Sequence, residues 1–223
     1  SDENKKARFL LTLFSKGKVT EEDPQKAALE KPRTAVFLKA LELFRKEYPN
    51  SKYSEILSFM EADTNYDLWL KSKDPADLDF ALAMYTKLLL NIPNSSHHER
   101  TMRLIAYSYF DKKDFINALK WLQSYQEKYP ESNEKYRTQM SMGESFSSIN
   151  NLDEAIKVYE KIEQDKNAGS FSVEAAFRKG DSYALFKDYA KAISIYEDAL
   201  KKYESSQEHY PNAYYNIAES RFW

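Results

Sequence analysis

The sequence predicts an all-α fold built from antiparallel helix pairs, and three observations support this prediction. Only 4 of the 223 residues are glycine, too few for the tight turns of most sheet proteins or for phosphate-binding loops. Aromatic residues make up 15% of the chain, far more than a disordered protein carries. Small and bulky residues also recur at a fixed interval, which is typical of a repeat protein.

The interval between equivalent residues is 37. Small residues where two helices cross let the backbones approach, and a large side chain of the neighbouring helix fills the space beside them. Each period is therefore expected to hold two packed helices joined by a short polar turn. The repeated small residues are Ala81, Ala118, Ala155, Ala192, Ala106, Gly143 and Gly180; the repeated large ones are Tyr85, Leu122, Tyr159, Tyr196, Tyr109, Phe146 and Tyr183.

Pro-x-Ser occurs three times, where the second helix of a pair should end. Proline disfavours helix in the preceding residue and cannot donate to the helical ladder. Serine accepts hydrogen bonds from free N–H groups at a helix start. We expect each proline to end one helix and each serine to be the N-cap of the next. The pairs are Pro49 and Ser51, Pro93 and Ser95, and Pro130 and Ser132.

One unit is longer than the others, because Ser51 and Ser95 are 44 residues apart. The seven extra residues fall between Ala62 and Ala81. They predict about two added turns in the first helix of that unit. They also predict a prominent loop over "WLKSKDPADLD", residues 69–79, in which "KSKDPADLD", residues 71–79, is an alternative binding site.

Residues 1–33 do not follow the period and are predicted to be an N-terminal leader or capping segment. "ENKKARFLLTLF", residues 3–14, is expected to form a short helix over the first repeat; a disordered leader is the alternative. The repeat array then occupies 34–223, as four to five units. The last helix is expected to be either half of an unfinished unit or a cap.

The columns of small and large residues resemble the tetratricopeptide repeat. Ala106, Tyr109, Ala118 and Pro130 stand at that family's spacing, and so do their counterparts in the next two units. The resemblance implies a right-handed superhelix of helix pairs whose first helices line a concave groove. The unit is 37 residues rather than the family's 34, so a different superhelical pitch is expected.

On this resemblance, one face of each first helix projects into the groove. Arginine and tyrosine are enriched in binding hot spots, and an arginine cluster suits bidentate pairing with carboxylates. A protein or peptide partner, with an acidic segment as a candidate ligand, is therefore expected. The predicted groove residues are Arg100, Arg103, Tyr107, Phe110, Arg137, Met140, Glu144, Phe177, Asp181, Tyr215 and Glu219.

Two alternatives concern these groove residues. The arginines could instead pair with acids on neighbouring turns, such as Glu99, Asp111 or Glu134. Some family members hold chaperone C-termini with a clamp of lysine, arginine and asparagine. Tyr107 and Glu144 stand where asparagines would be expected, which argues against that clamp here.

No pattern in the sequence indicates catalysis, a cofactor or a metal. The chain has no cysteine, and His97 and His98 are adjacent, so their side chains point about 100° apart and cannot chelate one metal as an i, i+4 pair would. No phosphate loop, GxSxG or HExxH motif is present. The sequence predicts a protein that is not an enzyme.

Composition also limits the partners. With a net charge of −2, the chain lacks the overall positive charge that non-specific nucleic-acid binding needs. The acidic residues Glu144, Asp181 and Glu219 argue against an RNA-binding groove. No apolar run approaches the ~20 residues of a membrane span. A leading Ser1 is compatible with a trimmed chain from which a targeting segment or lipid anchor has been removed.

The residue pattern of the stretch "LELFRKEYPNSKYSEI" is similar to the repeats of bacterial cell-envelope members of the family, the BamD-type lipoprotein and the TolA-binding periplasmic protein. In those proteins the repeats are scaffolds. The sequence therefore predicts a protein-interaction scaffold in the bacterial periplasm or cell envelope, with the cytoplasm as the alternative. Self-association through open terminal helices is the alternative function.

Overall fold

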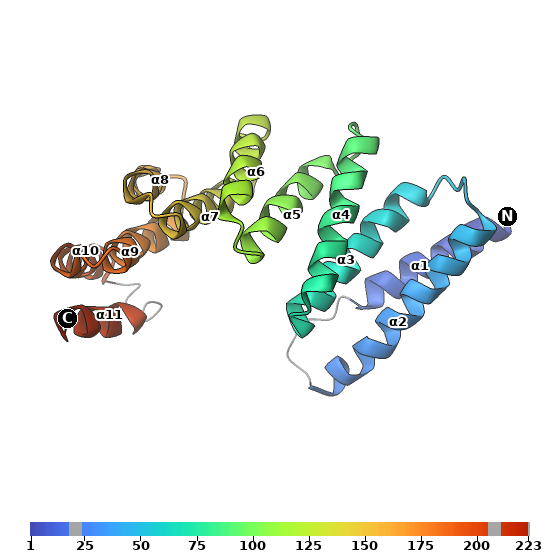
Figure 1. Ribbon diagram of the computed structural model, residues 1–223, viewed down its shortest axis with the longest axis horizontal. Helices are drawn as coiled ribbons and strands as arrows, with labels where there is room; N and C mark the ends of the chain where they lie inside the picture. Colours follow the sequence, from blue (N-terminus) through green and yellow to red (C-terminus); the bar gives the residue numbers. More distant parts are fainter. Residues whose placement is uncertain (18–23, 205–210, 223) are drawn as a thin grey trace. The chain divides into compact units, whose positions relative to one another are not determined.

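The computed structural model describes residues 1–17, 24–204 and 211–222. Every regular element in these ranges is a helix, which confirms the all-α prediction (Figure 1). The helices are α1 Asp2–Gly17, α2 Pro24–Glu47, α3 Ser54–Ser72, α4 Pro75–Asn91, α5 His98–Asp111, α6 Phe115–Lys128, α7 Lys135–Ser148, α8 Leu152–Gln164, α9 Ser170–Leu185, α10 Tyr189–Lys202 and α11 Pro211–Phe222.

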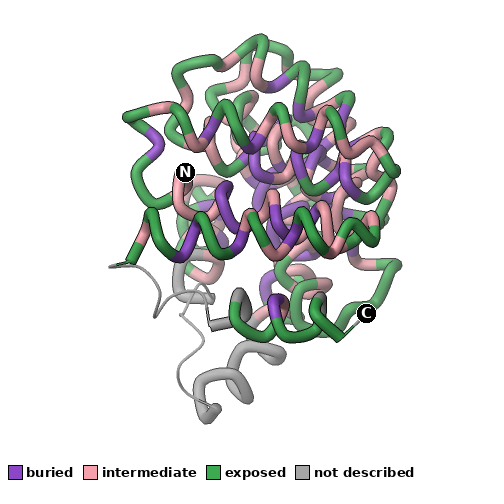
Figure 2. Tube along the Cα trace, turned by 90° about the vertical axis from the view of Figure 1, so that its left-hand side faces the viewer, coloured by how far each residue is buried: buried purple, intermediate pink, exposed green. Residues whose placement is uncertain are grey.

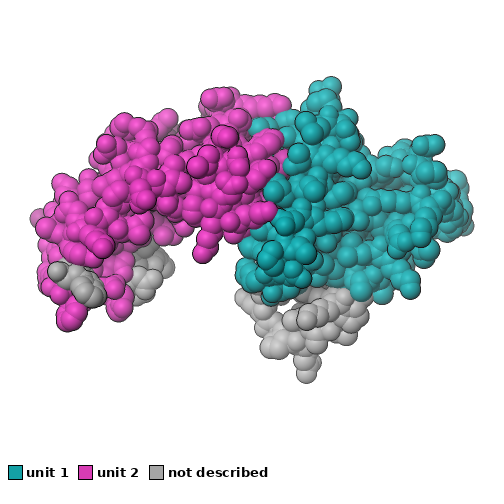
Figure 3. Space-filling view, in the orientation of Figure 1, with its two compact units in different colours: residues 1–104 teal, residues 105–223 magenta. Residues whose placement is uncertain are grey.

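The chain divides into two compact units, residues 1–104 and residues 105–223 (Figure 3). Each unit has a core of its own. Buried and exposed residues alternate along the helices, so that each helix buries one side (Figure 2). This is the pattern of amphipathic helices packed in pairs.

In the first unit α1 packs against α2 and α3. Ala7 and Leu10 of α1 share a buried cluster with Phe37, Leu41 and Leu57. The helix expected over residues 3–14 is thus present within α1, and it packs on α2 and α3. α2 continues through residue 33 without a break. The division between leader and repeats at that residue stays a prediction, and residues 18–23 of the expected leader lie outside the described residues.

The long unit differs from its prediction in one respect. α3 has the extra turns expected and reaches Ser72, but the predicted loop over residues 69–79 is wrong. Lys73 and Asp74 alone join α3 to α4, because Lys73 takes a left-handed conformation with φ of 57° and the Asp74 carboxylate accepts a 3.0 Å hydrogen bond from the N–H of Ala76. Pro75 then opens α4.

The same turn chemistry recurs inside each later pair. Lys113, Asn150 and Lys187 have φ of 61°, 61° and 62°, and each precedes an Asp or Asn whose side chain caps the second helix. A side chain in the left-handed region is uncommon outside glycine and asparagine. These turns are therefore made without glycine, which accounts for part of the low glycine content.

The second unit stacks its helix pairs in sequence. α7 packs with α8, and α9 packs with α10 and α8, while the first helices α7, α9 and α11 lie along one another. Two buried clusters fill the pairs, one around Tyr159 and one around Tyr196. This repeated neighbour-to-neighbour packing is the arrangement of a helical solenoid.

Glycine and tyrosine meet at the crossings as predicted. A Cβ placed on Gly143 would lie 2.5 Å from the ring of Tyr159. A Cβ on Gly180 would meet the ring of Tyr196 equally closely. Both tyrosine side chains are buried. The absence of a side chain at each glycine is what lets the aromatic ring fill the crossing.

The serines after the prolines open a turn ahead of each helix. The Ser51 hydroxyl accepts a 3.1 Å hydrogen bond from the N–H of Tyr53, and the Ser54 N–H reaches the Ser51 carbonyl at 3.0 Å. Ser95 and Ser132 accept equivalent hydrogen bonds at 3.0 and 3.1 Å. Their prediction as N-caps is wrong by two residues, because one turn precedes the helix.

Candidate functional site

The predicted groove residues divide between the two units. Arg100 and Arg103 fall within residues 1–104, and the other nine fall within residues 105–223. A single groove lined by all of them stays a prediction. The surroundings of each residue within its own unit show which ones can meet a partner.

Arg100 is engaged inside the first unit. Its guanidinium lies 2.5 Å from the Asp63 carboxylate and 5.0 Å from the centre of the Phe59 ring. Asp63 is only 4% exposed, and it also accepts a 2.7 Å hydrogen bond from the hydroxyl of buried Tyr85. This arginine is thus paired within the chain, with Asp63 of α3 as its partner.

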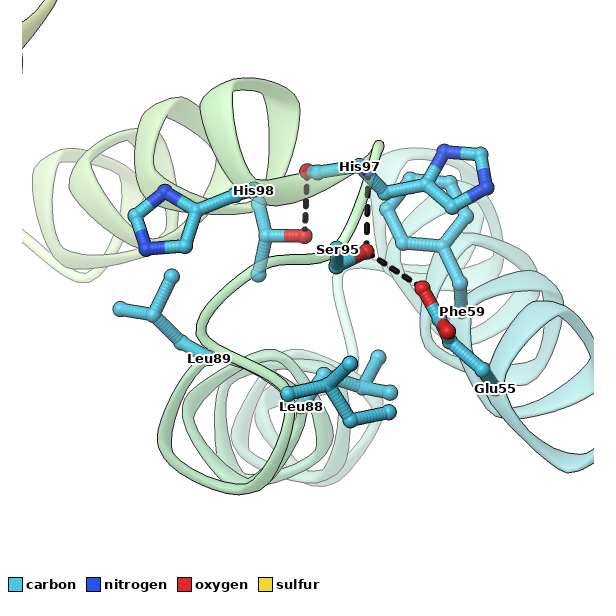
Figure 4. A pocket seen from close by; sticks show the side chains of 9 residues that line it. Glu55, Phe59, Leu88, Leu89, Ser95, His97 and His98 are labelled. Atoms are coloured by element: carbon cyan, nitrogen blue, oxygen red, sulfur yellow. Dashed lines mark hydrogen bonds between the residues drawn. The ribbon is translucent and has the colours of Figure 1, made fainter.

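A small cavity of about 10 Å³ lies beside the start of α5 (Figure 4). The Ser95 hydroxyl donates a 2.5 Å hydrogen bond to Glu55, and the His97 ring stacks on Phe59 with centroids 4.6 Å apart. His97 and His98 point in opposite directions (Figure 4). The cavity is too small for a ligand. It is a packing gap where α3, α4 and the start of α5 meet.

The first unit also has an open hollow of about 440 Å³ between α3 and α4. None of the predicted groove residues lines it. Its arginine, Arg45, is already held by Glu61 at 2.5 Å and by Ser58 at 2.9 Å. The rest of its lining is mixed: four residues are apolar and five are polar or charged, namely Pro49, Met84, Leu88 and Ile92, and Ser54, Glu55, Ser58, Lys87 and Asn91.

The second unit brings together three of the predicted residues. Arg137, Met140 and Glu144 of α7 line an open hollow of about 310 Å³ between α7 and α9. These two helices are the first helices of successive repeats, the face expected to bind. The remaining lining residues are Ser141, Phe171, Glu174 and Arg178.

Sequence reasoning missed the α9 side of this hollow. Phe171, Glu174 and Arg178 have the spacing of one helix face, i, i+3 and i+7. Glu174 follows Arg137 by one period of 37, and Arg178 follows Ser141 by the same interval. Extending those two columns by one period would have found both residues.

Phe177 is a correction. It is 5% exposed and belongs to the buried cluster with Tyr196, Leu200 and Ile217. One residue along a helix turns the side chain by about 100°, so Phe177 faces α10 and α11 while Arg178 faces the hollow. Phe177 therefore belongs to the core and not to a binding surface.

Asp181 is held by neighbouring helices. It accepts a 2.7 Å hydrogen bond from the Tyr196 hydroxyl and a 3.1 Å hydrogen bond from the Asn216 amide.

The other predicted groove residues lie on α11 and α5. Tyr215 and Glu219 are exposed on α11. In α5, Phe110 packs edge-on against Phe115 at 5.5 Å. Arg103 and Tyr107, also in α5, are half-buried.

The two arginines of the hollow have anionic neighbours. Arg137 lies 3.4 Å from Glu134, and Arg178 lies 3.7 Å from Glu174 and 3.6 Å from Asp181. Burial alone would lower the pKa of Arg178, but the charges of Asp181 and Glu144 outweigh it and raise that pKa. The guanidinium therefore stays charged, and the hollow can act by ion pairing and apolar contact.

Within 1–17, 24–204 and 211–222, no group of three His, Asp or Glu side chains is placed to hold a metal ion. Over the same residues, no helix is both long enough and apolar enough to cross a membrane. The candidate functional site is the hollow between α7 and α9, because three of the predicted groove residues line it.

Comparisons with known proteins agree with the helix-pair architecture. Residues 174–206 match the family model described as Tetratricopeptide repeat. No curated protein matches the sequence. Among solved structures, a MamA RS-1 ArsTM double mutant is similar with a TM-score of 0.62 and 14% identity, covering 91% of this chain and 97% of that chain.

Two further structures are similar at the same level. A Podosopora anserina protein with nearly identical TPR-like repeats gives a TM-score of 0.64 at 12% identity, covering 91% of this chain and 98% of that chain. The apo form of RapI gives 0.61 at 14% identity, covering 100% of this chain and 76% of that chain. At these identities the similarity shows the fold.

Proposed function

Because this chain is a tetratricopeptide-repeat protein, we propose that it is a non-catalytic scaffold that binds an extended or helical segment of another protein on the inner face of its first helices. The observation that supports the proposal is the hollow between α7 and α9. Exposed charges at Arg137 and Glu144 flank the buried Met140 there. Charged groups around an apolar patch are typical of a protein-binding surface.

Affinity capture tests the proposal. The full chain and an Arg137→Glu/Glu144→Arg variant, which reverses both exposed charges of the hollow, are immobilised side by side and exposed to lysate of the source organism. We expect the unaltered chain to retain a partner that the variant loses. A Glu154→Lys/Lys157→Glu variant on α8, whose side chains are 44% and 66% exposed, is the matched control and should retain the partner.

Circular dichroism first establishes that all three proteins are equally helical. Retention of the same partner by the unaltered chain and by the Arg137→Glu/Glu144→Arg variant would rule out the α7 and α9 face. Loss of the partner with the α8 control alone would instead locate binding on the outer surface.

Self-association is the second candidate function. On α11, Tyr214, Tyr215 and Phe222 are 53%, 67% and 81% exposed. Exposed apolar side chains can mark an interaction surface where they form one contiguous patch. The solution mass of the full chain across a concentration range tests this candidate: a scaffold keeps a monomer's mass, whereas a self-associating protein grows with concentration.

The proposed place of action is the bacterial periplasm or cell envelope. Its support is the style of the repeats, with "EYPNSKYSEI" as the clearest example. Fractionation of the source cells followed by detection of this chain tests it. Recovery in the cytoplasmic fraction would contradict the envelope and leave the scaffold proposal unchanged.

A further inference from the structure

The second helix α4 is apolar on the side that faces water. Four of its residues, spaced by three or four positions, share the face opposite the buried Ala81 and Tyr85. All four are exposed, the first by 42% and the last by 74%. A helix that is apolar on both sides is normally covered by protein on both. The four exposed residues are Phe80, Ala83, Lys87 and Leu90.

The later second helices lack this apolar face. One, two and three periods of 37 residues further along, the same four positions hold no large apolar side chain. The repeat itself therefore does not require the apolar face of α4. The equivalent residues are Asn117, Lys120, Ser124 and Glu127 on α6, Glu154, Lys157, Lys161 and Gln164 on α8, and Lys191, Ser194, Asp198 and Lys201 on α10.

The preceding second helix, α2, shares the feature with α4. Its equivalent positions lie 44 residues earlier, and they include Val36 and Leu43, which are 51% and 58% exposed. The apolar surface thus recurs on two successive second helices of the first unit. We call these eight positions the outer face: Val36, Lys39, Leu43 and Lys46 of α2, and Phe80, Ala83, Lys87 and Leu90 of α4.

The open hollow of about 440 Å³ in the first unit adjoins the outer face. Lys87 belongs to both, and Met84 and Leu88 of α4 line the hollow with Arg45 and Pro49 of α2. A recess of this kind can receive a large side chain of another protein, whereas the surface of a lipid bilayer offers no such projection. The concave shape therefore favours a protein partner.

The charges of the outer face indicate the chemistry of that partner. All three charged residues of the outer face are lysines, and none of its eight positions holds an acid. Lys46 pairs with Glu42 at 2.6 Å, whereas Lys87 makes no hydrogen bond or ion pair with any residue that the structure describes. A second copy docked through the same face would add lysines and no acid. A partner with acidic side chains would instead complement the outer face.

We infer that the outer face binds an amphipathic helix of a partner protein, with large apolar side chains along one side and acidic side chains beside them. Phe80 and Leu90 are ten residues apart, so the stripe on α4 is about 15 Å long, the length of a three-turn helix. The small Ala83 leaves a gap in this stripe into which a side chain of the partner helix can pack. The outer face shares no residue with the hollow between α7 and α9, so the inference does not rest on the proposed function.

The probe is an 18-residue helical peptide rich in alanine, with leucines along one side and two glutamates beside them. In a matched peptide, lysines replace the glutamates. Fluorescence anisotropy measures the binding of each peptide to the full chain. We expect the glutamate peptide to bind about fivefold more tightly than the lysine peptide. Lys87→Glu should remove or reverse this preference.

A second variant tests the apolar part of the outer face. Phe80→Asn/Leu90→Gln places on α4 the residue types that α6 and α8 carry at these positions. Both side chains are exposed, so the fold should persist, and circular dichroism checks this. We expect the variant to bind the glutamate peptide at least about tenfold more weakly. Lys120→Ala/Glu127→Ala, at the corresponding positions of α6, is the matched control and should bind it as the unaltered chain does.

The other results would overturn the inference. These are equal binding of the two peptides, no binding of either, or binding that Phe80→Asn/Leu90→Gln leaves intact. A solution mass that grows with concentration, and no longer does so in this variant, would assign the outer face to a second copy. Sedimentation with phosphatidylglycerol vesicles that the variant loses would assign it to a membrane. None of these results affects the scaffold proposal, because Arg137→Glu/Glu144→Arg changes no residue of the outer face.

Discussion

The Tyr196 hydroxyl donates a 2.7 Å hydrogen bond to the Asp181 carboxylate, one residue beyond the glycine whose missing side chain makes room for the Tyr196 ring. Gly180 therefore makes room for the Tyr196 ring, and Asp181 accepts the hydrogen bond of its hydroxyl. Asn216 extends the bond to α11. The hydrogen bonds of Asp181 thus join α9, α10 and α11.

Gly143→Ala should destabilise the second unit although alanine favours helix. The added Cβ would lie 2.5 Å from the Tyr159 ring. Overpacking of this kind costs ~1–3 kcal/mol, which exceeds the ~1 kcal/mol that alanine gains over glycine within a helix. Thermal unfolding of the variant should show a melting temperature lower by a few degrees.

A second substitution provides the control for that prediction. Ala106 and Leu122, both fully buried, occupy the corresponding positions of an earlier repeat. Gly143→Ala combined with Tyr159→Leu reproduces that pair, so the double variant should be more stable than the two single effects added together. Strict additivity would show that the glycine and tyrosine do not constrain each other.

Asp63→Ala should destabilise the first unit more than a typical surface change. Its carboxylate is 4% exposed and binds both Tyr85 and Arg100. Removing it leaves a fully buried tyrosine hydroxyl without this acceptor, which costs about 2–4 kcal/mol in the free energy of unfolding. Chemical denaturation measures the loss. In a double-mutant cycle, Asp63→Ala should cost less when Tyr85 is already replaced by phenylalanine. Independent effects of the two changes would contradict a stabilising hydrogen bond between Tyr85 and Asp63.

Glu163 should give the second unit a pH-dependent contribution to stability. Its carboxylate lies 2.5 Å from Lys179 and 2.7 Å from Lys202. Burial opposes ionisation, but the two lysines outweigh it and hold the pKa of Glu163 below its ordinary value of 4.5. A lowered folded-state pKa stabilises above the unfolded pKa, and this stabilisation is lost as pH falls through the folded value.

Glu163→Gln should therefore cost about 1–2 kcal/mol near neutral pH and less at a pH well below 4.5, where the carboxylate becomes protonated. Urea unfolding at both pH values measures the difference. Glu160→Gln, an exposed neighbour on α8, should change stability little at either pH. An effect of Glu163→Gln that is equal at both pH values would show that the ion pairs are not its source.

Ser132→Ala should destabilise the start of α7. The Ser132 hydroxyl accepts from the Glu134 N–H at 3.1 Å and lies 2.7 Å from the hydroxyl of buried Tyr125. Losing both should cost about 1–2 kcal/mol. Hydrogen exchange should show faster exchange at the start of α7. Ser148→Ala, exposed at the end of the same helix, is the comparison, and equal effects of both variants would contradict the role of Ser132.

The repeat could be predicted from the sequence because its small and large residues recur at a fixed interval along the chain. The glycine and tyrosine columns anticipated the contacts of Gly143 with Tyr159 and of Gly180 with Tyr196. The short turn at Lys73 was missed, because a lysine in the left-handed region has no distinctive sequence signal. Phe177 was placed on the wrong face because a shift of one residue turns the side chain by about 100°.

The sequence by itself determined the helix pairs, their period and the first helices that carry the hollow, since small residues, large residues and prolines act through neighbours on the same chain. Only the tertiary structure decided that Arg100 is paired with Asp63 of α3, because packing brings side chains that are far apart in the sequence close together. It also decided that α7 and α9 lie side by side with the hollow between them.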